Sequence, residues 1–202
     1  MGVSMKKIIP VMQYANIPNL LTTLGLCFGI AACYYLSERS LKGVLICMFS
    51  ASLIDLADGF LAVKLDKQTN FGKYMDTLTD FFICCVMPVL MVVTFVGNGI
   101  LLMGGIGFFC VCGLWRLANY NVSMPVKQTR FIGLPVPGAM LFVSMAIWGT
   151  VRYDLAVWWC VPIFFLTGLL MVSSFKLKKY GFWQMALWAV WLAFSAVVIV
   201  SS

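Results

Sequence analysis

The chain has 202 residues, of which 62% are hydrophobic and only 10% are charged, and its mean hydropathy is +0.98. A soluble globular protein carries about 25% charged residues, so this chain has too few charges to coat a surface that faces water. The composition argues against a cytoplasmic enzyme, a nucleic-acid-binding protein and a disordered tail. The net charge of +7 comes from basic residues scattered through a hydrophobic chain, and their natural partner is an anionic membrane surface.

Seven hydrophobic segments are long enough to cross a bilayer as helices, since a span needs about 20 apolar residues. They cover residues 19–36, 42–63, 75–96, 100–120, 134–151, 155–173 and 182–200. The runs lack the period-2 pattern of barrel strands, and in lipid the remaining way to satisfy the backbone is a helix. We therefore predict an all-α polytopic membrane helical bundle of about seven spans (six to eight), forming a single integral-membrane domain over residues 1–202.

The basic residues predict how this bundle is oriented. With the N-terminus in the cytoplasm, eleven Lys and Arg residues fall on the cytoplasmic side, and only Arg39, Lys42 and Arg152 fall outside. This asymmetry fits the positive-inside rule, so we expect a protein of the cell (inner) membrane. Lys6 and Lys7 precede a short apolar run that polar residues interrupt, which favours an N-terminal segment lying on the inner membrane surface over a cleaved signal peptide.

Three residue types narrow the chemistry further. The sequence has no histidine, which excludes histidine-based metal sites and general bases, and its eight cysteines form no Cys-x-x-Cys pair. We interpret these cysteines as small hydrophobic residues of membrane helices. Tryptophans in the last spans are expected at the membrane interface or facing lipid. They include Trp158, Trp159, Trp183, Trp188 and Trp191.

Four carboxylates lie inside apolar segments, where each costs about 3 kcal/mol on insertion scales. Asp55 and Asp58 are spaced i, i+3 near the inner end of the second span, and Asp76 and Asp80 are spaced i, i+4 near the inner start of the third. Both spacings place two side chains on one helix face, and a short inner loop joins the spans. We expect all four carboxylates to converge just below the cytoplasmic surface. With no Lys or Arg within the pairs, the expected counter-charge is one or two divalent cations, and oxygen ligands suit Mg²⁺ or Mn²⁺.

The same region contains a gapped motif. It reads Asp55-Leu-Ala-Asp58-Gly59-Phe-Leu-Ala62-Val63, followed by Gly72, Asp76 and Asp80. This pattern resembles the signature of the CDP-alcohol phosphotransferases, D-x2-D-G-x2-A-R-x8-G-x3-D-x3-D. Seven of its eight fixed positions match, with every gap correct. The departure is Val63, which stands where the family has Arg, and it implies either a reduced catalytic rate or another cation that supplies the charge.

Further segments extend the resemblance over roughly residues 16–140. Pro18-Asn19-Leu-Leu-Thr22 is similar to the family's entry to the first span. Arg116-Leu-Ala-Asn-Tyr-Asn121 and Phe131-Ile-Gly133-Leu-Pro135-Val-Pro137 are similar to the forms RLARFN and FxGLPxP of the phosphatidylserine synthase branch. Asn119 replaces the second Arg of RLARFN, which leaves the acceptor alcohol open.

The resemblance implies an enzyme that transfers a phosphatidyl group from CDP-diacylglycerol to L-serine and releases CMP. Asp55, Asp58 and Asp76 would hold the metals, and Asp80 would be both a shared ligand and the general base for the serine hydroxyl. Small residues would line the nucleotide pocket, two polar residues would donate to phosphate, and two arginines would bind the serine carboxylate. These residues are Gly59, Ala62 and Gly72 for the pocket, Asn19 and Thr22 for phosphate, and Arg116 and Arg130 for serine. The resemblance also implies a homodimer.

Other functions remain open at this point. The same chemistry could serve another acceptor, such as glycerol phosphate, inositol phosphate or choline, although a phosphorylated acceptor would favour a denser basic cluster. A cation transporter would use the four aspartates as an ion path, but it predicts carboxylates spread across the bilayer. A degenerate homologue, prompted by Val63, would bind the nucleotide-lipid without turnover. Lys127 and the lysines at 176, 178 and 179 are interpreted as charges of the inner membrane surface.

Overall fold

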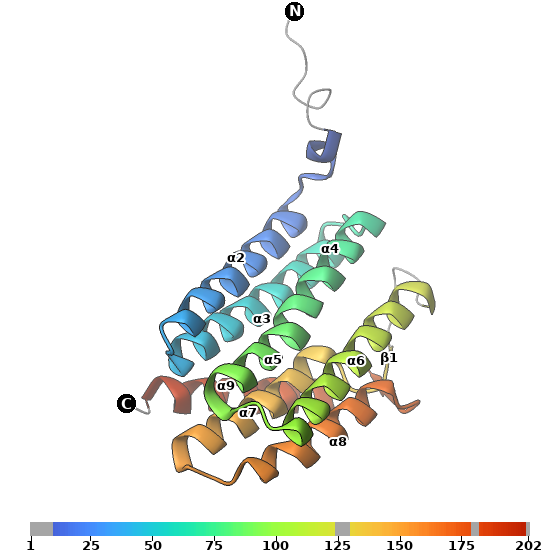
Figure 1. The fold of residues 1–202 in the computed structure, drawn as a ribbon. Coiled ribbons are helices and arrows are strands. Elements are labelled where there is room, and N and C mark those ends of the chain that lie inside the picture. The colour runs from blue at the N-terminus through green and yellow to red at the C-terminus, as the bar shows by residue number, and fades with distance from the viewer. Residues whose placement is uncertain (1–9, 124–129, 179–181, 201–202) are drawn as a thin grey trace, which may run out of the picture.

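The computed structural model describes residues 10–123, 130–178 and 182–200, and helices dominate it (Figure 1). In chain order the elements are η1 (Pro10–Tyr14), α2 (Ile17–Ser37), α3 (Leu41–Lys64), α4 (Asn70–Asp80), η2 (Phe81–Val86), α5 (Met87–Met91), η3 (Val92–Val96), α6 (Ile100–Ser123), β1 (Arg130–Ile132), α7 (Val136–Tyr153), η4 (Val157–Trp159), α8 (Cys160–Val172), β2 (Lys176–Lys178) and α9 (Phe182–Val200). The all-α helical bundle predicted from the sequence is confirmed.

Four helical segments of the described chain are long and apolar enough to cross a membrane, judged by length and composition. They are Ile17–Ser37, Leu41–Lys64, Asn70–Val96 and Ile100–Val122. The three later hydrophobic segments form helices as well, namely α7, α8 and α9. The bundle is therefore that of a polytopic membrane protein, and spanning by the last three helices stays a prediction.

Polar side chains define the starts of the three helices that come first in the bundle. The side chain of Asn16 accepts the backbone N–H of Asn19 at 2.9 Å and so caps α2. Ser40 caps α3 through Gly43, and Thr69 caps α4 by accepting the N–H of Gly72 at 3.0 Å. Such caps satisfy N–H groups that have no partner within the helix. They fix where α2 and α4 begin, beside the four aspartates.

The third span is one continuous helical rod with two π-helical stretches. α4 passes directly into the π-helix η2 at Phe81, α5 follows, and a second π-helix, η3, ends at Gly97. A π turn holds an extra residue, and such turns often occur at functional sites. Here the first one begins immediately after Asp80, at the end of the turns that carry Asp76 and Asp80.

The elements divide into two groups in Figure 1. Helices α2 and α3, the Asn70–Val96 rod and α6 lie side by side, whereas α7, α8 and α9 gather along the lower edge of the view. The connections after α6 and α8 meet as a short antiparallel pair, in which Phe131 lies opposite Leu177. Gly133, at φ +70°, follows this pair, and a Cβ there would collide with the carbonyl of Met171, so only glycine fits.

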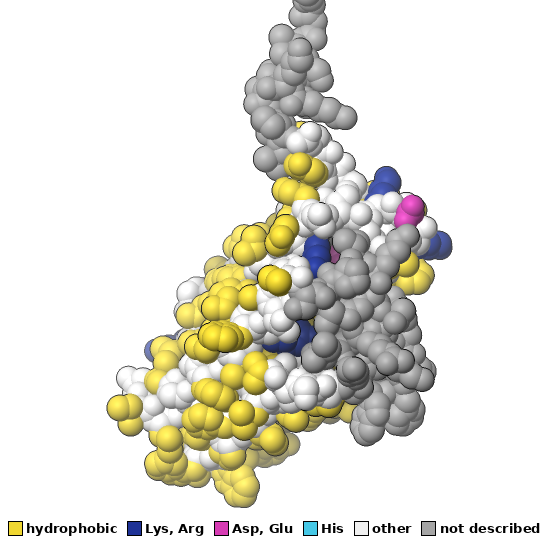
Figure 2. Space-filling view, turned by 90° about the vertical axis from the view of Figure 1, so that its right-hand side faces the viewer, with side chains coloured by type: hydrophobic (Ala, Val, Ile, Leu, Met, Phe, Trp, Pro, Cys, Tyr) yellow, Lys and Arg dark blue, Asp and Glu magenta, His cyan; other side chains and the backbone are white. Residues whose placement is uncertain are grey.

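Apolar side chains fill the centre of the bundle and also cover much of its outside. Phe109, Phe164 and Met87 are completely buried. Ile100 and Leu78 are among the large apolar residues that are exposed, as expected for helices that face lipid. In Figure 2 hydrophobic side chains gather over the lower left of the visible face, whereas acidic side chains show in its upper part.

Candidate active site

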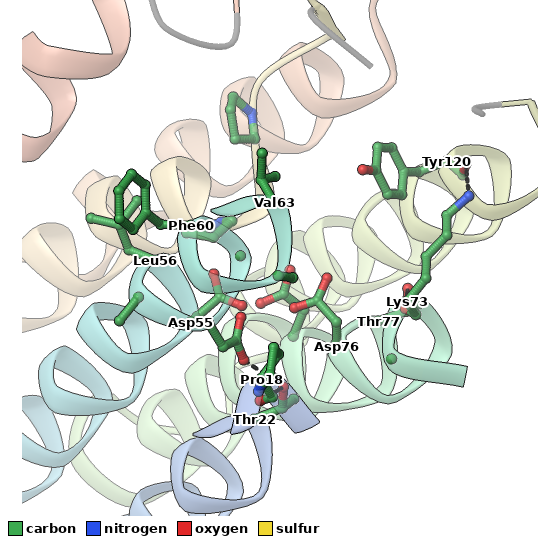
Figure 3. Close-up of a pocket in the computed structure, with 18 of the residues that line it drawn as sticks. Pro18, Thr22, Asp55, Leu56, Phe60, Val63, Lys73, Asp76, Thr77 and Tyr120 are labelled. Atoms are coloured by element: carbon green, nitrogen blue, oxygen red, sulfur yellow. Dashed lines mark hydrogen bonds between the residues drawn. The ribbon is translucent and has the colours of Figure 1, made fainter. Parts of the chain in front are cut away.

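The two pairs of aspartates meet between α3 and α4. One carboxylate oxygen from each of Asp55, Asp76 and Asp80 lies within 4.8 Å of the others. Figure 3 shows Asp55 and Asp76 directed toward one another from the two helices. The convergence expected of four carboxylates is therefore present for these three. Like charges at this separation repel strongly, so the cluster is suited to binding cations.

Asp58 lies outside this group of three but beside the same cavity. It is buried, and its Oδ2 accepts a hydrogen bond from the hydroxyl of Thr22 on α2. Thr22 is also buried. The hydroxyl of Thr22 thus holds Asp58, and no pattern in the residues predicts this hydrogen bond across 36 positions.

A cavity of about 610 Å³ opens beside the carboxylates. Its walls come from α2, α3, the α3–α4 link, α4, α6, α7 and α9. Leu56 and Phe60 lie to one side of Asp55, and Lys73 and Tyr120 lie on the opposite side of the view (Figure 3). The cavity is therefore apolar on one side and polar on the other, as an amphiphilic ligand requires.

Two of the glycines in the motif have different surroundings. A Cβ at Gly72 would lie 2.7 Å from the side-chain oxygen of Asn19, so this glycine allows α4 to approach α2. A Cβ at Gly59 would meet nothing within 4 Å. Gly59 and Ala62 both line the cavity. Gly72 is explained by helix packing, whereas the packing of the protein gives no reason for Gly59.

Asn19 connects the cavity to the segment that precedes α2. Its amide donates to the backbone carbonyl of Tyr14 at 2.8 Å, and its side chain lines the cavity. The ring of Tyr14 stacks on Phe71 of α4, with ring centroids 4.3 Å apart. The predicted N-terminal surface segment is described only from residue 10, and its last part is held against the start of α4.

Arg116 approaches the carboxylates from α6. It lines the cavity, is half-buried, and its Nε has no hydrogen-bond partner among the described residues. A brace between α4 and α6 lies about one turn further along α6. The Nζ of Lys73 donates to the carbonyls of Tyr120 and Asn121 at 3.2 Å each, and Asn121 Nδ2 donates to Thr77 Oγ1 at 2.9 Å.

The remaining predicted residues have different outcomes. The backbone of Arg130 begins β1, but its side chain lies outside the described part of the structure, as does the whole of Lys127. Val63 lines the cavity, and Asn119 is exposed on α6. The structure therefore brings together every other residue that the sequence placed in the site, since all of them line the cavity. They are Asn19, Thr22, Asp55, Asp58, Gly59, Ala62, Gly72, Asp76, Asp80 and Arg116.

Sequence reasoning missed the contribution of the last helix. Trp191 was expected at the interface or facing lipid, but this is wrong. It is 3% exposed, packs edge-on against Phe49 and lines the cavity together with Leu187. Trp158 and Trp159 are exposed, in line with the expectation, and the side chains of Trp183 and Trp188 lie outside the described part. Because α9 is apolar on every side, its sequence does not indicate which of its tryptophans is buried.

Comparisons with known proteins identify the family of this chain. Residues 15–200 match the sequence profile of the family described as CDP-alcohol phosphatidyltransferase. A CDP-diacylglycerol–serine O-phosphatidyltransferase of Methanocaldococcus jannaschii is 30% identical over 181 residues, which are 88% of this chain and 78% of the relative. A protein of the same name from Helicobacter pylori strain 26695 is 29% identical over 201 residues, 95% of this chain and 85% of the relative. The chain belongs to the CDP-alcohol phosphatidyltransferase family and is a membrane-embedded phosphatidyltransferase.

Proposed function

We propose that this protein is a phosphatidylserine synthase, which transfers the phosphatidyl group of CDP-diacylglycerol to L-serine and releases CMP. The observation that carries the proposal is the carboxylate cluster of Asp55, Asp76 and Asp80 at a cavity that is apolar on one side and polar on the other. A nucleotide-activated lipid has the same two-sided chemistry. The names of the relatives support serine as the acceptor.

The carboxylates fit a divalent metal. The donor set consists of oxygen atoms alone, with three carboxylates within 4.8 Å of one another, and hard oxygen ligands suit Mg²⁺ or Mn²⁺. We assign Asp55, Asp76 and Asp80, with Asp58 beside them, as the residues that would hold one or two ions. Such ions would offset the charge of the diphosphate and of the departing CMP.

Asp80 is assigned as the general base. In the reaction the serine hydroxyl oxygen forms a bond to the phosphorus of the phosphatidyl group, and the bond from that phosphorus to the oxygen of CMP breaks. The hydroxyl proton passes to the carboxylate of Asp80, which lies on the α4 face directed at the cavity. A positioned base of this kind accelerates proton transfer because it lies within hydrogen-bond reach of the hydroxyl.

The two substrates are assigned to opposite walls. Gly59 and Ala62 of α3 line the wall where the nucleotide would pack, since Gly59 leaves open space for it. Asn19 and Thr22 support this wall from α2, with Thr22 acting through its hydrogen bond to Asp58. Arg116 on α6 would bind the serine carboxylate, because a guanidinium grips a carboxylate with two parallel hydrogen bonds. Arg130 is retained as a second candidate for the same carboxylate.

The proposal places the site at the cytoplasmic side of the cell's inner membrane. The cavity lies at the end of the bundle that carries Lys64, Lys67 and Lys73, whereas Arg39 and Lys42 lie at the turn between α2 and α3. This distribution supports the orientation in which positive residues face the cytoplasm. The homodimer implied by the family resemblance is also part of the proposal, and its mass in a detergent micelle of known size tests it.

The acceptor can be tested directly. Purified protein in mixed micelles of CDP-diacylglycerol is supplied in turn with L-serine, glycerol phosphate, inositol phosphate and choline, and CMP release is measured with Mn²⁺ or Mg²⁺ present. We expect release with serine and a serine-containing lipid product. Release with another alcohol and none with serine would reassign the acceptor. Metal-dependent binding of CDP without release under any condition would identify a degenerate homologue.

A further inference from the structure

The C-terminus of α3 turns the chain back toward the cavity. Asp66 has φ +51°, and its N–H bonds to the carbonyl of Val63 at 3.2 Å, while the N–H of Lys67 bonds to the carbonyl of Ala62 at 3.0 Å. These two bonds and the left-handed residue form a Schellman motif. The motif brings Lys67 back beside the last turn of α3 instead of letting it continue along the helix axis.

Lys67 consequently stands at the same wall as Val63. Both residues line the cavity, together with Ala62 and the following Gln68 and Thr69. Val63 offers no charge to a ligand, although it stands on the α3 wall that also contains the small residues Gly59 and Ala62. The ammonium of Lys67 is exposed and has no hydrogen-bond or ion-pair partner among the described residues.

The other basic residues near the cavity differ from Lys67 in their contacts or in their place. Lys73 donates to two carbonyls at the end of α6 and lies over the ring of Tyr120, 4.9 Å from its centroid. Arg116 lines the cavity from α6. Lys64 is one residue from Val63 but does not line the cavity, and its Nζ lies 5.9 Å from the centroid of the Phe60 ring.

We propose that Lys67 binds the diphosphate of the CDP-linked lipid donor and supplies the positive charge that Val63 lacks. An ammonium on a flexible stem is a point charge that phosphate oxygens accept readily. Its place on the α3 wall assigns it to the donor and not to serine. The proposal rests on the proposed function, because it concerns a substrate of that reaction.

The test measures CMP release while the donor and serine concentrations are varied separately. Lys67→Gln is expected to raise the donor KM about tenfold, with kcat and the serine KM within about twofold of the wild-type values, since a tenfold change corresponds to loss of one charge-assisted contact. Lys67→Arg is expected to retain most of the donor affinity. Lys64→Gln is the matched control, because it removes the same charge from the same helix end outside the cavity, and its donor KM should not change.

A rescue variant separates binding from a structural role. Val63→Arg, added to Lys67→Gln, returns a cation to the same wall and is expected to recover the donor KM. If Lys67 had only a structural role, the second substitution would leave the donor KM raised. An unchanged donor KM in Lys67→Gln, an equal rise in Lys64→Gln, or a rise in the serine KM alone would overturn the proposal. A wild-type protein that releases no CMP with any alcohol would instead refute the proposed function.

Discussion

Asp80 differs in its assigned role from the other three carboxylates of the cavity. Asp80→Asn keeps the size of the side chain but removes its capacity to take a proton, so we expect CMP release to fall by about 10²- to 10⁴-fold. Donor binding should be largely retained, because Asp55, Asp58 and Asp76 remain. Asp58→Asn should instead weaken both metal and donor binding.

The control for this substitution lies at the other end of the bundle. Asp154→Asn makes the same change at the left-handed C-cap of α7, at φ 50°, a conformation that asparagine tolerates. Its activity should match that of the wild type. CMP release and CDP binding, measured on the same preparations, check both variants. Wild-type turnover in Asp80→Asn would remove Asp80 from the chemistry.

Adding a single methyl group at Gly59 tests whether the nucleotide packs against this part of α3. Since a Cβ there meets no protein atom within 4 Å, Gly59→Ala should fold normally, and helix propensity alone favours alanine by about 1 kcal/mol. A ligand packed against the backbone would be displaced, and we expect donor binding to weaken by about 1 to 3 kcal/mol.

Gly107→Ala in α6 is the matched change, because its Cβ also meets nothing within 4 Å and Gly107 does not line the cavity. Thermal unfolding and the donor KM are compared for the two variants. Equal donor KM values in both would show that no ligand approaches Gly59.

At the scale of the elements, we expect the brace between α4 and α6 to hold Arg116 in place relative to Asp80. Asn121→Ala removes the hydrogen bonds to Thr77 and to the carbonyl of Leu117, at a cost of about 1 to 2 kcal/mol. We expect the midpoint of thermal unfolding in detergent to fall by a few degrees and the serine KM to rise more than the donor KM.

Asn98→Ala tests whether these effects belong to the brace. Asn98 is an exposed asparagine in the turn between η3 and α6, and its replacement should change neither quantity. A stable Asn121→Ala variant with wild-type kinetics would show that α6 is held by its apolar packing alone.

Much at this scale follows from sequence. The hydrophobic segments predicted at 19–36, 42–63 and 100–120 correspond to α2, α3 and α6 within a few residues, because runs of this length in lipid allow little besides a helix. The spacing of the aspartates also predicts that they meet. The π turn after Asp80 and the pairing of β1 with β2 were not predicted, since both depend on contacts between distant segments and not on local pattern.

The residues of the candidate site that belong to a short sequence motif were predicted correctly as lining one cavity. Two acidic pairs with glycines at fixed gaps are visible in the sequence, and they line one cavity as expected. Lys67 and Trp191 were not assigned to it. Lys67 reaches the cavity through a reversal of the chain at Asp66, and Trp191 through the docking of α9 on α3, and neither event has a signature in the residues alone.

At the scale of the whole molecule, the concentration of carboxylates predicts dependence on divalent metal. Removing metal with EDTA should abolish CMP release, and adding Mn²⁺ or Mg²⁺ in excess should restore it, because the carboxylates of Asp55, Asp76 and Asp80 offer oxygen ligands within 4.8 Å of one another. Readdition of Ca²⁺ provides a comparison, since its larger radius and looser coordination suit the site less. Full activity in the presence of the chelator would refute the metal assignment.

Helix α9 packs against α3 through two separate contacts. Lys42 Nζ donates to the carbonyl of Ile199 at 2.6 Å, and Trp191 packs against Phe49 with ring centroids 4.5 Å apart. Leu187 and Trp191 then line the cavity opposite residues that were synthesised more than a hundred positions earlier. During translation, therefore, a nascent chain that has already inserted all four aspartates still has an incomplete reaction chamber. We therefore expect activity to begin only after α9 has entered the bilayer.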